Sequence, residues 1–223
     1  MTGIQRHNTQ AQSTFTRGRQ VIYELPSPAY SKPSILITLP PKSRWTSGLH
    51  FHKTHTEYLS VIQGAASITL NGTTRTHTPS DGVLTIYAYT RHSWCRASPD
   101  GEELIVREWT DPEDGQKEIF FRNLNSVLAE GETGHMLTLQ LHMISWASDN
   151  WPIFFSCAKV PIVGGAIETL VTHLVLFFAV LVGTFMELET QYEAYTPALP
   201  AKRPWIGQGI GAYKDEEDSP LLK

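Results

Sequence analysis

The stretch that decides the fold is residues 48–64, which read GLHFHKTHTEYLSVIQG. In an extended strand, residues two apart project from the same face, so His50 and His52 are expected to point together. The polar residues 53–56 are a connection of hairpin length, and we expect them to return the chain so that Glu57 faces the same space. Two neutral imidazoles and one carboxylate on one side suit a divalent first-row metal.

A third histidine would complete this set, and His92 is the candidate. It follows the apolar strand expected at residues 83–87 and the short loop after that strand. We therefore predict that His50, His52, Glu57 and His92 hold one divalent transition metal. The same ligands serve iron, manganese, zinc and nickel, so these residue types do not choose among the four metals.

Short strands separated by turn residues are expected on both sides of this stretch. The segments rich in Val, Ile, Leu, Tyr and Thr are residues 20–25, 34–39, 58–63, 66–70, 83–87 and 104–109. Asn71-Gly72 is the strongest hairpin signal, and it joins residues 66–70 to a strand at residues 73–77. Several short strands at regular spacing predict an antiparallel barrel or sandwich.

The spacing of the candidate ligands is more specific than their types. It reads His-x-His at His50 and His52, four residues, Glu57, six residues and Gly64. This pattern resembles the first motif of the cupin superfamily, and His92 stands where the second motif carries the remaining histidine. The resemblance implies a mostly β fold, an antiparallel cupin (jelly-roll) barrel, here with a C-terminal helical extension. It also implies that the barrel forms a homodimer.

A narrower resemblance is to fungal cupin-domain proteins, and it covers roughly residues 20–197. It is carried by the C-terminal apolar segment and by residues 118–124 (EIFFRNL), 149–152 (DNWP) and 192–197 (YEAYTP). Similar proteins occur in fungal gene clusters for polyketides, salicylaldehydes among them, and are described as cupin-domain oxidoreductases. The resemblance implies an oxidoreductase that acts on a small oxygenated substrate beside other pathway enzymes.

Five segments are expected along the chain. Apolar residues recur at helical spacing in residues 118–128 and 136–146, which predicts two helices beyond the barrel. The segments are a mobile N-terminal arm (1–19), the cupin barrel (20–110), helices packing on the barrel (111–150), an apolar C-terminal helix (160–190) and a tail (191–223).

Residues 169–186 form an uncharged run. As a helix it would be about 27 Å long, just short of a typical hydrocarbon core. Two interpretations stay open: this helix associates with or crosses a membrane, or it is a buried or dimer-forming helix of a soluble protein. The polar first residues show no secretory signal, so we expect the protein on the cytoplasmic side and not secreted.

Composition excludes several classes of protein. Hydrophobic residues make up 41% and charged residues 18%, which favours a packed core over general disorder. The formal charge of −4 argues against a nucleic-acid partner. Two cysteines exclude a disulfide-stapled scaffold and a Cys-rich zinc module.

The second histidine motif is surrounded by candidate pocket residues. Tyr87, Tyr89 and Trp94 could line a pocket for an aromatic or polyketide substrate. Arg91 and Arg107 could hold its carboxylate or enolate. The alternative is simple packing, because aromatic strand residues most often fill space.

Three reaction classes remain open for the predicted site. With iron, dioxygen and a chelating substrate give oxidation; with zinc, manganese or nickel, a Lewis acid gives cyclisation, isomerisation or decarboxylation. Without catalysis, the barrel is a small-molecule-binding or scaffolding module. The chain shows no nicotinamide or flavin fingerprint. His55 is expected to be a solvated loop residue and not a ligand.

Overall fold

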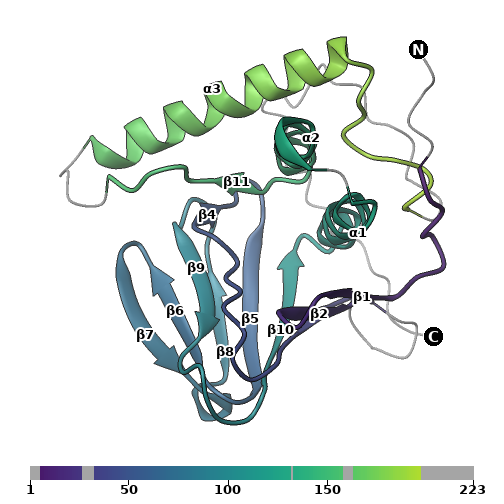
Figure 1. Ribbon diagram of the computed structural model, residues 1–223. Helices are drawn as coiled ribbons and strands as arrows, with labels where there is room; N and C mark the ends of the chain where they lie inside the picture. Colours follow the sequence, from purple (N-terminus) through teal and green to yellow (C-terminus); the bar gives the residue numbers. More distant parts are fainter. Residues whose placement is uncertain (1–5, 27–32, 132, 158–162, 197–223) are drawn as a thin grey trace, which may run out of the picture.

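The structure of the protein is a computed structural model, and it describes residues 6–26, 33–131, 133–157 and 163–196. Within these ranges the chain forms eleven β-strands and three α-helices. Figure 1 shows the strands in a barrel below a layer of helices. The predicted fold class, a mostly β antiparallel barrel with a C-terminal helical extension, is confirmed.

The strands form two antiparallel sheets. The larger sheet has the order β1-β2-β3-β10-β5-β8 and consists of β1 (Thr14–Arg17), β2 (Val21–Glu24), β3 (Ile35–Leu39), β5 (Thr56–Gln63), β8 (Val83–Ile86) and β10 (Leu104–Asp111). The smaller sheet has the order β11-β4-β9-β6-β7 and consists of β4 (His50–Phe51), β6 (Ala66–Leu70), β7 (Thr73–His77), β9 (His92–Arg96) and β11 (Trp151–Pro152).

The hydrophobic core contains side chains of both sheets, because alternate residues of each strand point inward. In β10, the buried residues Leu104 and Val106 alternate with partly buried neighbours. Other buried members of the core are Ile37, Leu39, Leu59, Val61, Ile68 and Trp94. Strands β2, β3, β5, β6, β7, β8 and β10 lie where the sequence pattern predicts strands.

The expected mobile arm at residues 1–19 is wrong for its last part. Residues 14–17 form β1, which pairs with β2, and Phe15 is buried in the core. This edge strand has a single large apolar residue, so its stability comes from pairing with β2 and not from a local pattern. Residues 1–5 lie outside the described part of the chain.

Two helices cover the barrel. Helix α1 (Gln116–Ala129) and helix α2 (Gly134–Ala147) lie where helical spacing predicts them. Phe121 of α1 belongs to the barrel core, and its ring lies 5.1 Å from the ring of Tyr23. Helix α1 therefore closes one side of the space between the sheets. After the helices, Tyr195 is fully buried against α1 and α2, whereas residues 197–223 of the expected tail lie outside the described residues.

Helix α3 (Gly164–Phe185) lies above α2 and β11 along one edge of the molecule (Figure 1). Its inner face buries Thr172, Leu176 and Ala179, and the Thr172 hydroxyl donates to the Pro152 carbonyl oxygen at 2.7 Å. Its outer face is the apolar stripe of α3: Ile167, Leu170, Leu174, Phe177, Phe178, Leu181, Val182 and Phe185. By length and composition alone, α3 could cross a membrane.

Candidate metal centre

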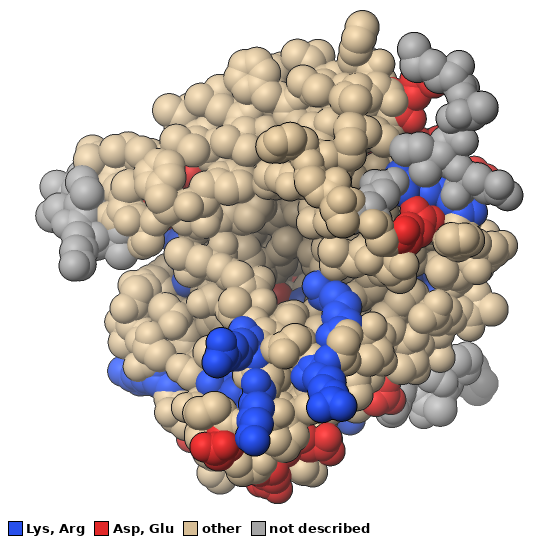
Figure 2. All heavy atoms as spheres, viewed as in Figure 1, with Lys and Arg blue, Asp and Glu red and all other residues tan. Residues whose placement is uncertain are grey.

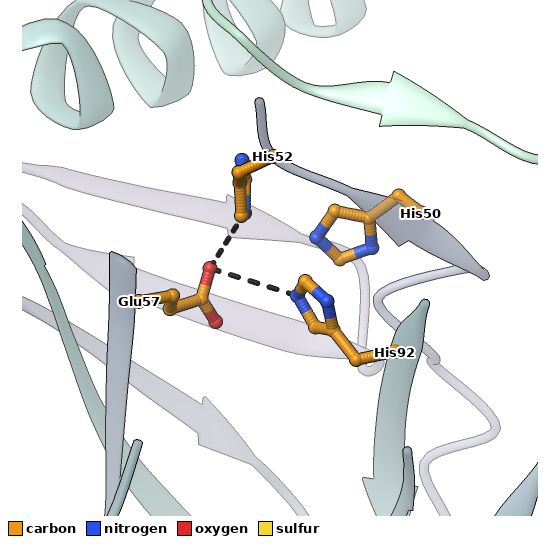
Figure 3. Close-up of side chains that lie close together, drawn as sticks. All are labelled: His50, His52, Glu57 and His92. Carbon is orange, nitrogen blue, oxygen red and sulfur yellow. Dashed lines mark hydrogen bonds and ion pairs between the residues drawn. The ribbon is translucent and has the colours of Figure 1, made fainter. Parts of the chain in front are cut away.

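Four buried side chains from both sheets converge inside the barrel. His50 on β4 pairs directly with His92 on β9, and Glu57 projects from β5 of the opposite sheet. Figure 3 shows these three and His52 pointing toward one common space. One donor atom from each of the four residues lies within 4.8 Å of the others. The structure therefore brings together the four ligands that the sequence predicts.

Backbone carbonyl groups orient all three imidazoles. Each Nδ1 lies close to a carbonyl oxygen: His50 to Gly48 at 2.9 Å, His52 to Asp149 at 2.6 Å and His92 to Thr90 at 2.9 Å. A carbonyl oxygen only accepts hydrogen bonds, so each Nδ1 carries the proton and donates it. Each Nε2 then faces the shared space, where that of His52 lies 2.8 Å from Glu57 Oε2, and it is the nitrogen that would bind a metal in place of a proton.

The unsatisfied polar atoms of this cluster fit a cation. His92 Nε2 is buried and has no hydrogen-bond partner, although buried polar atoms normally have one. Burial, followed by the nearby imidazoles of His92 and His52, lowers the pKa of His50 well below its ordinary value, so His50 is neutral. Donors on opposite sides of a divalent first-row ion lie about 4 Å apart. The spacing and the chemistry of the four donors therefore fit such an ion.

The last element of the ligand motif also has a structural reason. Gly64 follows β5 with φ +78°, and a Cβ atom there would lie 2.7 Å from the carbonyl oxygen of Glu103. Only glycine combines this conformation with such a close approach of the next strand. The two-sheet antiparallel barrel thus carries its candidate ligands on β4, directly after β4, on β5 and on β9, with the expected glycine. The barrel has the cupin fold.

Comparison with solved structures finds several proteins that match a little under half of this chain. The chain is similar to KdgF from Halomonas sp. with a TM-score of 0.35 and 16% identity, covering 45% of this chain and 86% of that one. It is similar to the cupin domain of Schizosaccharomyces pombe Cnp3 with a TM-score of 0.33 and 16% identity, covering 45% and 72%. These overlaps include less than half of the chain, and no functional assignment rests on them.

Two fungal proteins are similar in sequence over part of the chain. The probable oxidoreductase virH of Hypocrea virens is 35% identical over 79 residues, which are 34% of this chain and 36% of virH. The oxidoreductase iacF of Pestalotiopsis fici is 34% identical over 86 residues, which are 37% of this chain and 42% of iacF. The match thus spans less than half of each relative. No protein-family model matches the chain.

A partly buried lysine of α1 reaches the carboxylate of Glu57, one of the four candidate ligands. Lys117 Nζ lies 2.8 Å from Glu57 Oε2 and 3.1 Å from Glu108 Oε2. Burial alone would raise the pKa of Glu57, but the Lys117 ammonium and the hydrogen bond from His52 hold it well below its ordinary value. Glu57 is therefore ionised, as a metal ligand must be.

Glu108, the second carboxylate beside Lys117, also contacts the hydrophobic core. Burial raises the pKa of Glu108, whose Oε1 accepts a hydrogen bond from Trp94 Nε1 at 2.6 Å. Sequence reasoning missed Lys117 and Glu108. Lys117 lies one residue before the helix predicted at residues 118–128, and its spacing of three and four residues from Phe120 and Phe121 is the signal that could have found it.

The expectation that His55 is a solvated loop residue is wrong. His55 is 5% exposed and lies between two carboxylates, with Nδ1 2.8 Å from Asp149 Oδ2 and Nε2 3.2 Å from Asp114 Oδ2. Burial alone would lower its pKa, but the two carboxylates raise it to about 9, so His55 is an imidazolium at neutral pH. It was missed because Asp149 comes from a distant segment of the sequence.

A cavity of about 250 Å³ opens beside His50, His52 and Glu57. Figure 2 shows this face of the molecule hollowed between the helices and the barrel. Much of the wall is aromatic or aliphatic, formed by Tyr23, Ile37, Trp45, Phe120, Phe121 and Leu124. A small apolar ligand with a polar end directed at the metal centre would fit such a wall.

The aromatic residues expected around the second motif lie elsewhere. Tyr87 is 70% exposed and Tyr89 is 49% exposed, whereas Trp94 is buried in the core. None of these three side chains lines the cavity. Tyr87 and Tyr89 follow β8, where the chain has already left the barrel interior.

The two arginines expected to hold a substrate also lie outside the cavity lining. Arg91 binds α3, with Nε 3.2 Å from Glu168 Oε2 and an Nη2 hydrogen bond of 2.7 Å to the Gly165 carbonyl oxygen. Arg107 alternates with the buried Val106 on β10, so it points away from the core. Period-two alternation along β10 could have excluded Arg107 from the sequence alone.

Proposed function

We propose that this chain is a metal-dependent cupin enzyme that acts on a small oxygenated molecule, with oxidoreductase chemistry first among its reactions. The observation that carries the proposal is the set of four converging, buried donors beside a cavity of about 250 Å³. The names of virH and iacF support an oxidoreductase. We further propose a substrate from fungal polyketide biosynthesis, handled together with other enzymes of its pathway.

The chain's own residues define what happens in the cavity. His50, His52, His92 and Glu57 would hold the divalent ion, which when bound supplies Lewis acidity and, if it is iron, reactivity with dioxygen. The Lys117 ammonium keeps the Glu57 carboxylate ionised and in place. Phe121 and the other apolar wall residues would contact the carbon skeleton of the substrate and exclude water.

Two alternatives are separable from this proposal. One is a Lewis-acid cyclase, isomerase or decarboxylase of a polyketide intermediate, which uses the same ligands without dioxygen. The other is a non-catalytic cupin that binds a small molecule or gathers pathway enzymes. Oxygen consumption by the metal-loaded protein, measured with an extract of cells that carry the pathway, distinguishes the oxidoreductase from the Lewis-acid enzyme. The product profile of the pathway, rebuilt with and without the chain, detects the non-catalytic class.

The metal content of the purified protein tests the site directly. After incubation with iron, manganese, zinc or nickel and removal of free ion, we expect about one equivalent of bound metal. The His52→Ala variant should bind at least ~10–100-fold more weakly, because that range is already typical for loss of a supporting group. The His135→Ala variant changes an exposed histidine of α2 and serves as the matched control.

Elemental analysis measures the bound metal, and competition with a chelator measures the affinity of each variant. Less than about a tenth of an equivalent of every metal in the wild-type protein would contradict a metalloenzyme. Equal affinity of the wild-type and His52→Ala proteins would contradict the ligand assignment.

We also propose that the apolar stripe of α3 lies on a membrane surface, on the cytoplasmic side. The stripe has no charged side chain, and the charged residue of α3, Glu168, is buried against Cys157 and Arg91. The inner face of α3 packs on α2 and β11, so the helix can lie in the membrane plane without leaving the protein. A homodimer through the same stripe is the competing occupant.

A further inference from the structure

Three cationic side chains line the cavity, and two of them form ion pairs with carboxylates of the protein. Arg17, Lys117 and His55 all contribute to its wall. Each of the latter two lies between two carboxylates, Glu57 and Glu108 for Lys117 and Asp114 and Asp149 for His55. The protein itself therefore supplies the counter-charges at these two positions.

Arg17 has no such counter-charge. Among the described residues, no carboxylate lies within ion-pair distance of its guanidinium. The Arg17 Nε atom is buried without a hydrogen-bond partner, and Nη2 donates to the hydroxyl of Tyr23. The guanidinium also lies over the Tyr23 ring, 4.7 Å from its centre. Its position is therefore held from one side by an uncharged group.

Tyr23 does not neutralise this cation. Burial raises the pKa of the Tyr23 hydroxyl far above its ordinary value, so the hydroxyl remains neutral. Arg17 is partly buried, and a charge that is even partly removed from water without a partner is destabilising, so a bound anion would stabilise this side chain. Burial correspondingly lowers the pKa of Arg17, yet a guanidinium stays protonated at neutral pH.

An arginine fork matches a carboxylate in shape as well as charge. Guanidinium and carboxylate groups form paired, charge-assisted hydrogen bonds, which lysine cannot reproduce. The apolar wall around Tyr23 includes Trp45 and Phe121, whose rings lie 6.2 Å and 5.1 Å from the Tyr23 ring. A carbon skeleton lying along this wall would connect an anionic end at Arg17 to the space beside the candidate metal ligands.

We propose that Arg17 is an anion-binding residue and that the substrate is a small carboxylic acid, whose carboxylate binds Arg17 while its other oxygen atoms face the metal centre. The second half of this statement rests on the proposed function, whereas the first half does not. The sequence expectation gave the anion-holding role to Arg91 and Arg107, which lie outside the cavity lining. The structure supports Arg17 on β1 for that role instead.

Matched acids and amides test this inference. The probes are acetate, benzoate and 2-hydroxybenzoate, each compared with its uncharged amide by isothermal titration of the metal-free and the zinc-treated protein. We expect at least one acid to bind about ten- to hundredfold more tightly than its amide, the range for a charge-assisted hydrogen bond. The Arg17→Met variant should lose this preference, and Arg17→Lys should keep part of it.

The controls separate folding, metal and anion effects. Arg75→Met removes an exposed arginine of β7 and should leave the preference unchanged. Thermal unfolding checks that Arg17→Met is folded; should it unfold, Arg17→Gln and Arg17→Lys replace it in the same comparison. The inference is overturned if none of the three acids binds more tightly than its amide, or if the full preference survives in folded Arg17→Met or Arg17→Gln, which have no cation at this position.

The same titrations distinguish this inference from the proposed function. If the protein takes up no metal but an Arg17-dependent preference for an acid persists, the proposed enzyme is contradicted and the anion site stands. If the protein binds one metal and His52→Ala removes it, but acids and amides bind equally, the metal centre stands and the anion site is wrong.

Discussion

Lys117 allows two carboxylates to lie inside the barrel. Glu57 and Glu108 are 2% and 4% exposed, and both are within ion-pair distance of the same ammonium. Two buried carboxylates without this cation would repel each other, and one would take up a proton. The pKa of Lys117 is raised because the attraction of the two carboxylates outweighs its burial. A single residue of α1 thus sets the ionisation of a ligand on β5.

The Lys117→Met variant tests this coupling. Methionine fills a similar volume but leaves two buried carboxylates without their cation. Breaking a buried ion pair by removing one partner costs about 3–5 kcal/mol, so we expect a loss of that order in the free energy of unfolding. Urea unfolding of the metal-free protein measures it, and Arg75→Met is the exposed-cation control. A loss below about 1 kcal/mol would show that Lys117 does not carry this charge balance.

Among the elements, the segment that follows α2 completes the metal centre from outside the barrel. Asp149 accepts hydrogen bonds from the backbone N–H groups of Lys53 and Thr54, both at 2.9 Å, and its carbonyl oxygen accepts from His52 Nδ1. The adjacent β11 pairs with β4, which carries His50. The helical extension therefore positions two of the candidate metal ligands, His50 and His52, through its backbone.

Helix α3 depends on one glycine for its contact with α2. A Cβ atom on Gly183 would lie 2.0 Å from Met143 Sδ and 2.9 Å from Cε. Met143 is buried, packed with Val180 and Leu188, so it has little room to move. The close approach of the two helices thus requires a small residue at this position.

We predict that Gly183→Ala destabilises the protein by about 1–3 kcal/mol through overpacking against Met143. The Gly183→Ala change should cost less in the Met143→Ala background than in the wild type, because the added methyl group then has space. Thr184→Ala changes the neighbouring exposed position and is the control. Thermal unfolding gives the comparison, and purely additive losses would argue against a direct contact.

Taken whole, the molecule has one edge unlike the rest of its surface. The apolar stripe of α3 holds several large exposed side chains, with Phe185 91% exposed. Figure 2 shows hardly any Lys or Arg along this edge, while these residues gather on the barrel below it. Soluble monomers rarely present so many large apolar side chains together. Because the stripe is uncharged, any binding to lipid should depend on buried apolar area and not on anionic headgroups.

Vesicle flotation tests the membrane proposal. We expect the protein to float with phosphatidylcholine vesicles, and the double variant Leu174→Glu/Phe178→Glu to float at least about tenfold less. Val83→Glu places one glutamate on an exposed apolar residue of β8, away from α3, and should float like the wild type. If the wild type does not float, and the α3 variant instead abolishes a dimer seen by ultracentrifugation, a second copy covers the stripe.

Carbonate extraction of membranes distinguishes the two ways of binding. A helix that lies in the membrane plane with its inner face docked on α2 is released by carbonate. A helix that crosses the bilayer is retained, and it would have to separate from α2 and β11.

Much of the barrel could be predicted because its strands bury alternate residues. Alternate residues are buried in β5 and β10, and the Asn71-Gly72 turn is visible in the sequence. β4 lies in the extended segment that the sequence predicts at His50 and His52, whereas β11 could not be predicted, because two residues carry no period. β11 forms by pairing with β4, which also pairs with β9.

The sequence by itself determined the barrel and the four candidate ligands. These depend on local spacing: His50 and His52 share a face because they are two apart, and Glu57 follows one short connection later. Only the tertiary structure decided which other side chains meet them. Lys117 lies on α1, Asp149 lies in the segment after α2, and Arg17 lies on β1. Their roles follow from the partners beside which the fold places them. Such contacts between distant segments have no signature in spacing, so the fold alone revealed them.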